Sequence, residues 1–201
     1  MYFAIKIYDK PDVSALRDQI RQTHLDYLKE FDAQTLFAGP MITDDGTLEL
    51  GSHRLLDFPD RATAEAHVAA EPYIQGGAQI PGSVDRWEPV AATSWRDCPR
   101  TRGNMHFLIH ADDKPDSGDL RASLQDAAER YYAQTPVTCM TRGSLCSDDG
   151  KQVRGDLLMI DVPDVDTAHR FWEADPRNAG GLYANVEVFR WRFGRVFDRF
   201  L

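Results

Sequence analysis

His24 is the side chain in this sequence best suited to acid–base chemistry. It follows Ile20 and precedes Leu28 by four residues each, so the three side chains share one face of a helix predicted from Val13 to about Phe31. Imidazole exchanges a proton near neutral pH, which makes such a histidine a candidate general base. The alternative is a histidine that only fills the core.

Two arginines lie on the same side of this predicted helix. Arg21 precedes His24 by about one turn and Arg17 by about two. Because a guanidinium stays charged, both would disfavour the imidazolium form of His24 and keep the ring neutral. We expect Arg17 and Arg21 to bind the substrate or stabilise an oxyanion. In the alternative, both extend into solvent along the helix edge.

Glu71 is the candidate acid partner of His24. It stands at the end of a second predicted helix, directly before Pro72 and Tyr73. If both helices cover one sheet face, its carboxylate would fix the tautomer of His24 and stabilise its protonated form. The alternative is a solvated glutamate near a helix end. Ser52 and Tyr73 are further candidates for substrate contacts.

The elements that must position these side chains occur twice. Sliding the 201 residues against themselves by 104 positions aligns residues 1–87 with 105–191, without a gap and with about 27 identities. Most identities are Gly, Pro or Asp, the residues typical of loops. We expect a first unit at 1–90, a linker at 91–104 and a second unit at 105–201.

Each repeat predicts the order β-α-β-β-α-β, which is typical of the ferredoxin-like fold with both helices on one sheet face. Two such α+β units, packed sheet to sheet, would form an eight-stranded barrel-like core within one chain. The first repeat predicts strands at 2–8, 35–38, 48–58 and 83–88 and helices at 13–31 and 62–70. The second predicts strands at 106–111, 137–142, 155–162 and 183–192 and helices at 118–133 and 166–174.

The second repeat lacks the candidate base. Ala128 occupies the position of His24, whereas Asp175 occupies that of Glu71. We therefore expect one competent pocket per chain, in the first unit.

Composition limits the partners. The net charge is −9 and no long basic run occurs, which disfavours nucleic acid. No apolar run approaches the ~20 residues that span a bilayer, so we expect a cytoplasmic protein without membrane contact. The three cysteines, Cys98, Cys139 and Cys146, suit neither a disulfide framework nor a zinc site. His106 and His110 are about 13 Å apart along a strand, too far to share one metal ion.

The sequence resembles the YCII-related (YciI-like) family in both repeats, over nearly the whole chain. In the first repeat the matching residues are Asp9-Lys10-Pro11-Asp12, Leu16-Arg17, Arg21, His24-Leu25, Ala38-Gly39-Pro40, Gly51-Ser52 and Glu71-Pro72-Tyr73. In the second they are Asp113 to Asp116, Gly143, Gly155 and Asp175-Pro176.

The resemblance implies a dimeric α+β barrel, usually built by two chains, and a histidine–aspartate pair that maps onto His24 and Glu71. Glutamate replaces the usual aspartate of the family here. One branch of the family is associated with dehydrochlorination of chlorinated hydroxyhydroquinones, without a metal or organic cofactor.

Two functions follow as hypotheses. The first is a cofactor-independent lyase or isomerase that acts on a small hydroxylated aromatic or enol-like molecule. The second is a non-catalytic small-ligand binding or accessory protein. A homodimer is compatible with either function.

Overall fold

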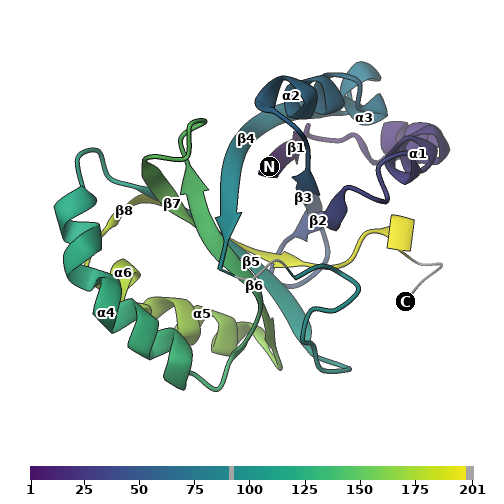
Figure 1. Ribbon diagram of the computed structural model, residues 1–201. Coiled ribbons are helices and arrows are strands. Elements are labelled where there is room, and N and C mark those ends of the chain that lie inside the picture. The colour runs from purple at the N-terminus through teal and green to yellow at the C-terminus, as the bar shows by residue number, and fades with distance from the viewer. Residues whose placement is uncertain (91–92, 198–201) are drawn as a thin grey trace. The chain divides into compact units, whose positions relative to one another are not determined.

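The computed structural model describes residues 1–90 and 93–197, which form two compact units. Residues 1–87 and 191–197 make up the first unit, and residues 88–90 and 93–190 make up the second. Both have the α+β composition and element order that the repeat predicts (Figure 1). No helix in the described ranges is long and apolar enough to cross a membrane.

The first unit is a four-stranded antiparallel sheet covered by helices on one face. Its strand order is β4-β1-β3-β2, which is the ferredoxin-like order. The strands are β1 (Tyr2–Asp9), β2 (Thr35–Ile42), β3 (Glu49–Asp57) and β4 (Gln79–Pro89). The helices are α1 (Ser14–Lys29), α2 (Arg61–Ala69) and α3 (Pro72–Gln75).

Alternation along the strands decides which face the helices cover. Phe3, Ile5 and Ile7 of β1 and Leu56 of β3 point to the same side and form one core with Val68 of α2. Ser52 and Arg54 of β3 lie on this side too, because they are opposite Ile7 and Ile5 in the sheet register. The helix-facing side of β3 therefore changes from apolar to polar towards α1.

The second unit repeats this arrangement with strand order β8-β5-β7-β6. Its strands are β5 (Met105–Asp113), β6 (Thr138–Cys146), β7 (Val153–Val162) and β8 (Tyr183–Trp191). Its helices are α4 (Gly118–Gln134), α5 (Val165–Glu173) and α6 (Pro176–Ala179). Its hydrophobic core includes Phe107, Ile109, Leu158, Phe171 and Trp172.

Three details differ from the sequence prediction. The strand that begins at Thr35 does not end before Gly39-Pro40, because its pairing with β3 continues at Met41 opposite Gly51. Two four-residue helices, α3 and α6, follow the acids Glu71 and Asp175. No side chain of α1 is fully buried, because a polar cavity lies beneath this helix.

The ends of the repeats also pack differently from the predicted boundaries. Residues 93–104 of the predicted linker belong to the second unit, where Trp95 and Cys98 are buried and Thr93 Oγ1 donates to the Met140 carbonyl at 2.7 Å. Apolar side chains of this size cost free energy when left in water, so the segment packs. Residues 91–92 of this linker and residues 198–201 of the predicted second unit lie outside the described residues. Residues 191–197, predicted to belong to the second repeat, instead pack with the first unit.

This C-terminal segment is fixed along β2. The Gly194 N–H donates to the Ala38 carbonyl at 2.9 Å, and Val196 and Phe197 of the short 3-10 helix η1 (Arg195–Phe197) are buried. Gly39 permits this close approach, because a Cβ at that position would lie 1.9 Å from the carbonyl oxygen of Arg192.

Candidate functional site

His24 and Glu71 meet between α1 and the start of α3. Nδ1 of His24 lies 2.8 Å from Oε1 of Glu71, whose side chain is completely buried, whereas the side chain of His24 is 13% exposed. An ionised carboxylate can only accept, so the neutral ring donates from Nδ1 and carries its lone pair on Nε2. The arrangement leaves Nε2 as the basic atom of the ring.

Local backbone structure holds Glu71 in place. Glu71 is the N-cap of α3, and its Oε1 accepts from the Tyr73 N–H at 3.1 Å. Its Oε2 forms a buried ion pair with Arg54. Burial by itself would raise the pKa of Glu71, but Arg54 and the bond to His24 outweigh burial and hold that pKa well below its usual range. Glu71 is therefore ionised at neutral pH.

Arg54 is a site residue that the sequence analysis missed. It lies in β3 with 1% of its side chain exposed, and Nη1 donates to Nε2 of His67 at 3.3 Å. Burial and the positive charge of Arg54 lower the pKa of His67 to about 3. The Tyr27 hydroxyl donates to the His67 carbonyl at 2.8 Å and lies 3.1 Å from Nδ1. His67 is thus a neutral acceptor that supports Arg54.

The protonation state of His24 follows from these neighbours. Burial lowers its pKa, Glu71 raises it, and Arg54 and Arg17 lower it further, so the net shift is downward from 6.5. Helical spacing alone predicted that Arg17 and Arg21 would have this effect. Arg21 is not among the main causes of this shift, and its guanidinium is 37% exposed and pairs with Asp18 on its own helix. Arg54 has the role expected of Arg21.

Tyr73 and Arg17 form the wall next to His24. The ring of Tyr73 is buried and stacks on that of His24, with centroids 4.1 Å apart and planes 24° apart. The guanidinium of Arg17 lies over the Tyr73 ring, 5.2 Å from its centroid, and is anchored by Asp9 and Glu49, each at 2.6 Å. This packing fixes the orientation of the imidazole.

A cavity of about 80 Å³ adjoins His24. Five of the six predicted site residues line it, namely Arg17, Arg21, His24, Ser52 and Tyr73. Glu71 lies behind the imidazole. Arg192 and Arg195 of the C-terminal segment also line the cavity and were not predicted, because the sequence repeat assigns them to the other unit.

The second unit has a cavity of about 170 Å³ at the corresponding place, and its polar groups differ. Apolar side chains replace three basic groups of the first unit, two that line its cavity and one behind it. Ala128, Leu158 and Phe171 stand at the positions of His24, Arg54 and His67. The carboxylate of Asp175 survives, but it accepts from the Tyr132 hydroxyl at 2.6 Å rather than from a base.

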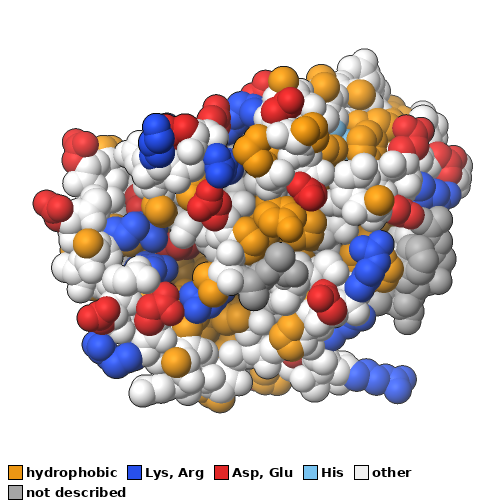
Figure 2. Space-filling model, in the orientation of Figure 1, with side chains coloured by type: hydrophobic (Ala, Val, Ile, Leu, Met, Phe, Trp, Pro, Cys, Tyr) orange, Lys and Arg blue, Asp and Glu red, His pale blue; other side chains and the backbone are white. Residues whose placement is uncertain are grey.

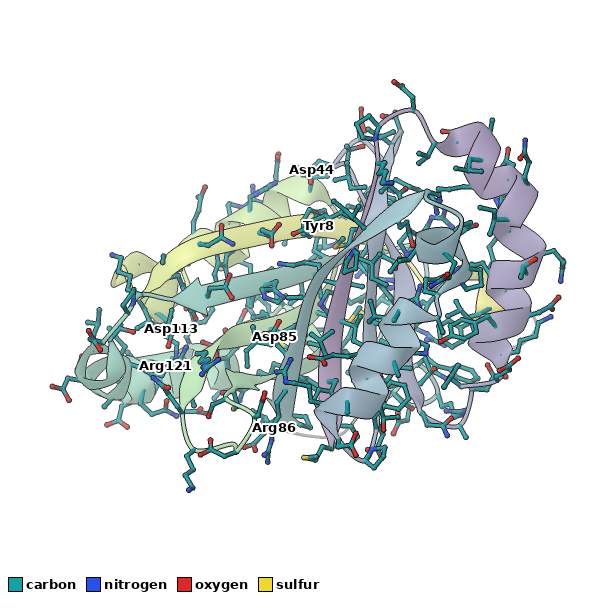
Figure 3. The ribbon with its side chains drawn as sticks, turned by 90° about the horizontal axis from the view of Figure 1, so that it is seen from above. Tyr8, Asp44, Asp85, Arg86, Asp113 and Arg121 are labelled. Carbon is teal, nitrogen blue, oxygen red and sulfur yellow. The ribbon has the colours of Figure 1, made fainter. Side chains whose placement is uncertain are left out.

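Charged groups of the second cavity bind one another. Arg121 reaches Asp113 at 2.6 Å and Asp156 at 2.7 Å, and Figure 3 shows Arg121 beside Asp113. Arg177 donates to Gln125 at 2.8 Å, and the Tyr183 hydroxyl donates to Asp156 at 2.7 Å. Among the residues that the structure describes around this cavity, no histidine lines it. The second unit therefore keeps a polar pocket without an acid–base pair.

Other predicted features stay apart from the cavities. His106 lies 3.4 Å from Asp161, and among the residues described no group of three or more His, Cys, Asp or Glu side chains could hold a metal ion. The three cysteines are free thiols. On the face shown in Figure 2, acidic and basic side chains are interspersed.

Comparison with known proteins identifies the repeats. The model of the YCII-related domain matches residues 1–87 and 105–192. A search among curated proteins gave no match. The 5-chloro-2-hydroxyhydroquinone dehydrochlorinase of Burkholderia phenoliruptrix AC1100, solved with 2,5-dihydroxybenzoquinone, is 29% identical over 45% of this chain and 97% of its own, with a TM-score of 0.40.

Two further solved structures match nearly the whole chain. A variant of chlorite dismutase from Candidatus Nitrospira defluvii is 9% identical over 98% of this chain and 92% of its own (TM-score 0.61). A heme-binding protein from Thermus thermophilus is 11% identical over 99% and 94% (TM-score 0.55). At these identities the likeness shows the fold alone. The family and the α+β fold class expected from the sequence are confirmed, whereas the sheet-to-sheet packing of the units stays a prediction.

Proposed function

This chain belongs to the YCII-related domain family, with one copy in each unit, and on that premise we propose that it is a cofactor-independent lyase or isomerase. Its substrate is a small hydroxylated aromatic or enol-like molecule bound in the first unit. The observation that supports this function most directly is the 2.8 Å contact between His24 and the ionised, buried Glu71.

The proposed reaction begins with a proton transfer. Nε2 of neutral His24 takes a proton from an O–H or C–H group of the substrate, and the electron pair of that bond stays on the substrate as a phenolate or enolate. Glu71 stabilises the imidazolium that forms, because its negative charge lies against Nδ1. In an isomerase the proton returns to a different carbon, and in a lyase the electron pair expels a leaving group such as chloride.

The lining of the cavity supports stabilisation of the anion. Arg17 and Arg21 line the cavity beside His24 and would supply positive charge where the phenolate or enolate develops. Ser52 and Tyr73 line the same cavity and contact the substrate beside His24. The second unit, which lacks the histidine, serves as scaffold.

The test compares His24→Asn with the wild-type chain on two probes. One assay follows chloride release from 5-chloro-2-hydroxyhydroquinone, in which the substrate loses HCl. The other follows exchange of the ring hydrogens of 2,5-dihydroxybenzoquinone in D2O by NMR. We expect the wild-type chain to accelerate at least one reaction and H24N to lose about 10²–10⁴-fold of that rate, the usual contribution of a general base.

His169→Asn is the matched control, since His169 lies on α5 outside both cavities. It should keep the full rate. If the wild-type chain accelerates neither reaction, or H24N retains its rate, the proposal is wrong. The alternative of a non-catalytic binding protein then gains support if the ¹⁵N resonances of His24 show a ring that does not titrate.

A further inference from the structure

Positive charge is concentrated at the first cavity. Among the described residues that line it, five carry a guanidinium and only Glu49 carries a carboxylate. The arginines are Arg17, Arg21, Arg54, Arg192 and Arg195. The chain as a whole has a net charge of −9, so the sign of the cavity opposes that of the protein. A local excess of cations in an acidic protein indicates an anionic ligand.

Most of these arginines are already neutralised. Arg54 pairs with Glu71, and Arg17 pairs with Asp9 and Glu49. Arg192 shares Glu49 with Arg17. The carboxylates of Asp9, Glu49 and Glu71 are therefore already paired with Arg17, Arg54 and Arg192.

Two guanidiniums remain near the mouth. Within the described part of the chain, the acid that pairs with Arg21 is the exposed Asp18 alone. Arg195 is exposed at the edge of the cavity, and within residues 1–90 and 93–197 no acid pairs with it. The two lie on neighbouring elements, because η1 packs against α1.

The backbone of Arg195 is fixed even though its side chain reaches solvent. Gly194 is hydrogen-bonded to Ala38 at 2.9 Å on one side of it, and Val196 and Phe197 are buried on the other. The fold therefore fixes the backbone position from which the Arg195 side chain reaches the edge of the cavity.

The second unit offers an internal comparison. Its cavity is lined by three arginines and by two acids, Glu129 and Asp156, and Arg121 and Tyr132 bind two further acids, Asp113 and Asp175. In the sequence, the positions that correspond to Arg192 and Arg195 are Glu88 and Ala91. The excess of positive charge thus belongs to the cavity that contains His24.

We propose that the ligand of the first cavity carries a carboxylate in addition to the group that exchanges a proton with His24, and that Arg195 binds this carboxylate with Arg21 beside it. A planar guanidinium forms paired hydrogen bonds with a carboxylate, which suits this role. Only the part of this inference that concerns the proton-exchanging group rests on the proposed function. The carboxylate site depends on charge and not on catalysis.

The test uses two probes that share a ring and differ in one carboxylate, 2,5-dihydroxybenzoate and 1,4-dihydroxybenzene. Their dissociation constants are measured on the full chain by NMR titration or calorimetry. We expect the wild-type chain to bind the dihydroxybenzoate about tenfold more tightly, with a preference that shrinks as NaCl is raised. Arg195→Gln should reduce the preference to less than about threefold, and Arg195→Lys should keep part of it.

Arg130→Gln is the matched control, because Arg130 is exposed on α4 and lines neither cavity. It removes the same charge from the protein and should leave the preference intact. Equal binding of the two probes, no binding of the dihydroxybenzoate at millimolar concentration, or equal effects of R195Q and R130Q would overturn the inference. H24N should keep the preference, so failure of the proposed function and failure of the carboxylate site give different results.

Discussion

Replacing Arg54 by leucine, the residue at the equivalent position of the second unit, should destabilise the first unit strongly. Arg54 and Glu71 are 1% and 0% exposed, so neither charge can be solvated when its partner is removed. Breaking a buried ion pair by removing one partner typically costs about 3–5 kcal/mol. We expect R54L to lower the free energy of unfolding by that amount at pH 7.

The loss should depend on pH in a defined direction. In the wild-type chain the pKa of Glu71 is below its ordinary value of 4.5, so its stabilising contribution is present above pH 4.5 and is lost as the pH falls through the folded-state pKa. Without Arg54, burial raises the pKa of Glu71, and the destabilisation grows as the pH rises above 4.5. The difference between R54L and wild type should therefore increase from pH 4 to pH 7.

Urea unfolding followed by circular dichroism at several pH values measures this effect. Arg130→Leu removes an exposed guanidinium and should change the free energy of unfolding by less than about 0.5 kcal/mol. In the second unit the Tyr132 hydroxyl satisfies Asp175, and Leu28 is the counterpart of Tyr132. R54L/L28Y should therefore recover about 1–2 kcal/mol. A loss below about 1 kcal/mol for R54L, or one that is flat between pH 4 and pH 7, would refute this account of Glu71.

Three further predictions concern the same unit. His67→Phe removes the acceptor at 3.3 Å from Arg54 and should cost about 1–3 kcal/mol in urea unfolding, while an unchanged midpoint would show that Arg54 needs no support. The kcat/KM of any reaction found should fall at acid pH with a midpoint below 6.5, because neutral His24 is the base and its pKa is lowered. A pH–rate profile measures this midpoint, and a midpoint above 6.5 would contradict the prediction. Gly39→Ala places a Cβ 1.9 Å from the Arg192 carbonyl and should release the C-terminal segment from β2. The amide of Gly194 should then exchange faster with solvent, and an unchanged exchange rate would contradict this prediction.

The repeat and its loop residues made the fold predictable. At Gly51 φ is 144°, and a Cβ there would lie 2.1 Å from the Ile7 carbonyl. Glycine is therefore required where β3 approaches β1 this closely, and the second repeat has Gly155 at the same position. His24 could be found because helical spacing placed it above the sheet, and Glu71 because it precedes a proline at a helix end. Their contact follows from both helices covering one face.

Arg54 and His67 were missed because their positions suit a core. Alternation along β3 places residue 54 beside apolar neighbours, where a charge is stable only if a partner lies opposite, and spacing along one strand does not reveal that partner. The signal was in the repeat itself, which has Leu158 and Phe171 at these positions. An ionic group in the first copy, at a position where the second copy has an apolar group, indicates a site that is present in the first copy alone.

The C-terminal segment gives the first unit a discontinuous sequence, since residues 191–197 complete what residues 1–87 begin. During synthesis the chain must be extended by 110 residues after Trp87 before Phe197 emerges. At about 5–20 residues per second this takes roughly 5–22 s. Throughout that interval the nascent cavity is without Arg192 and Arg195, so its lining is complete only after the second repeat has been translated.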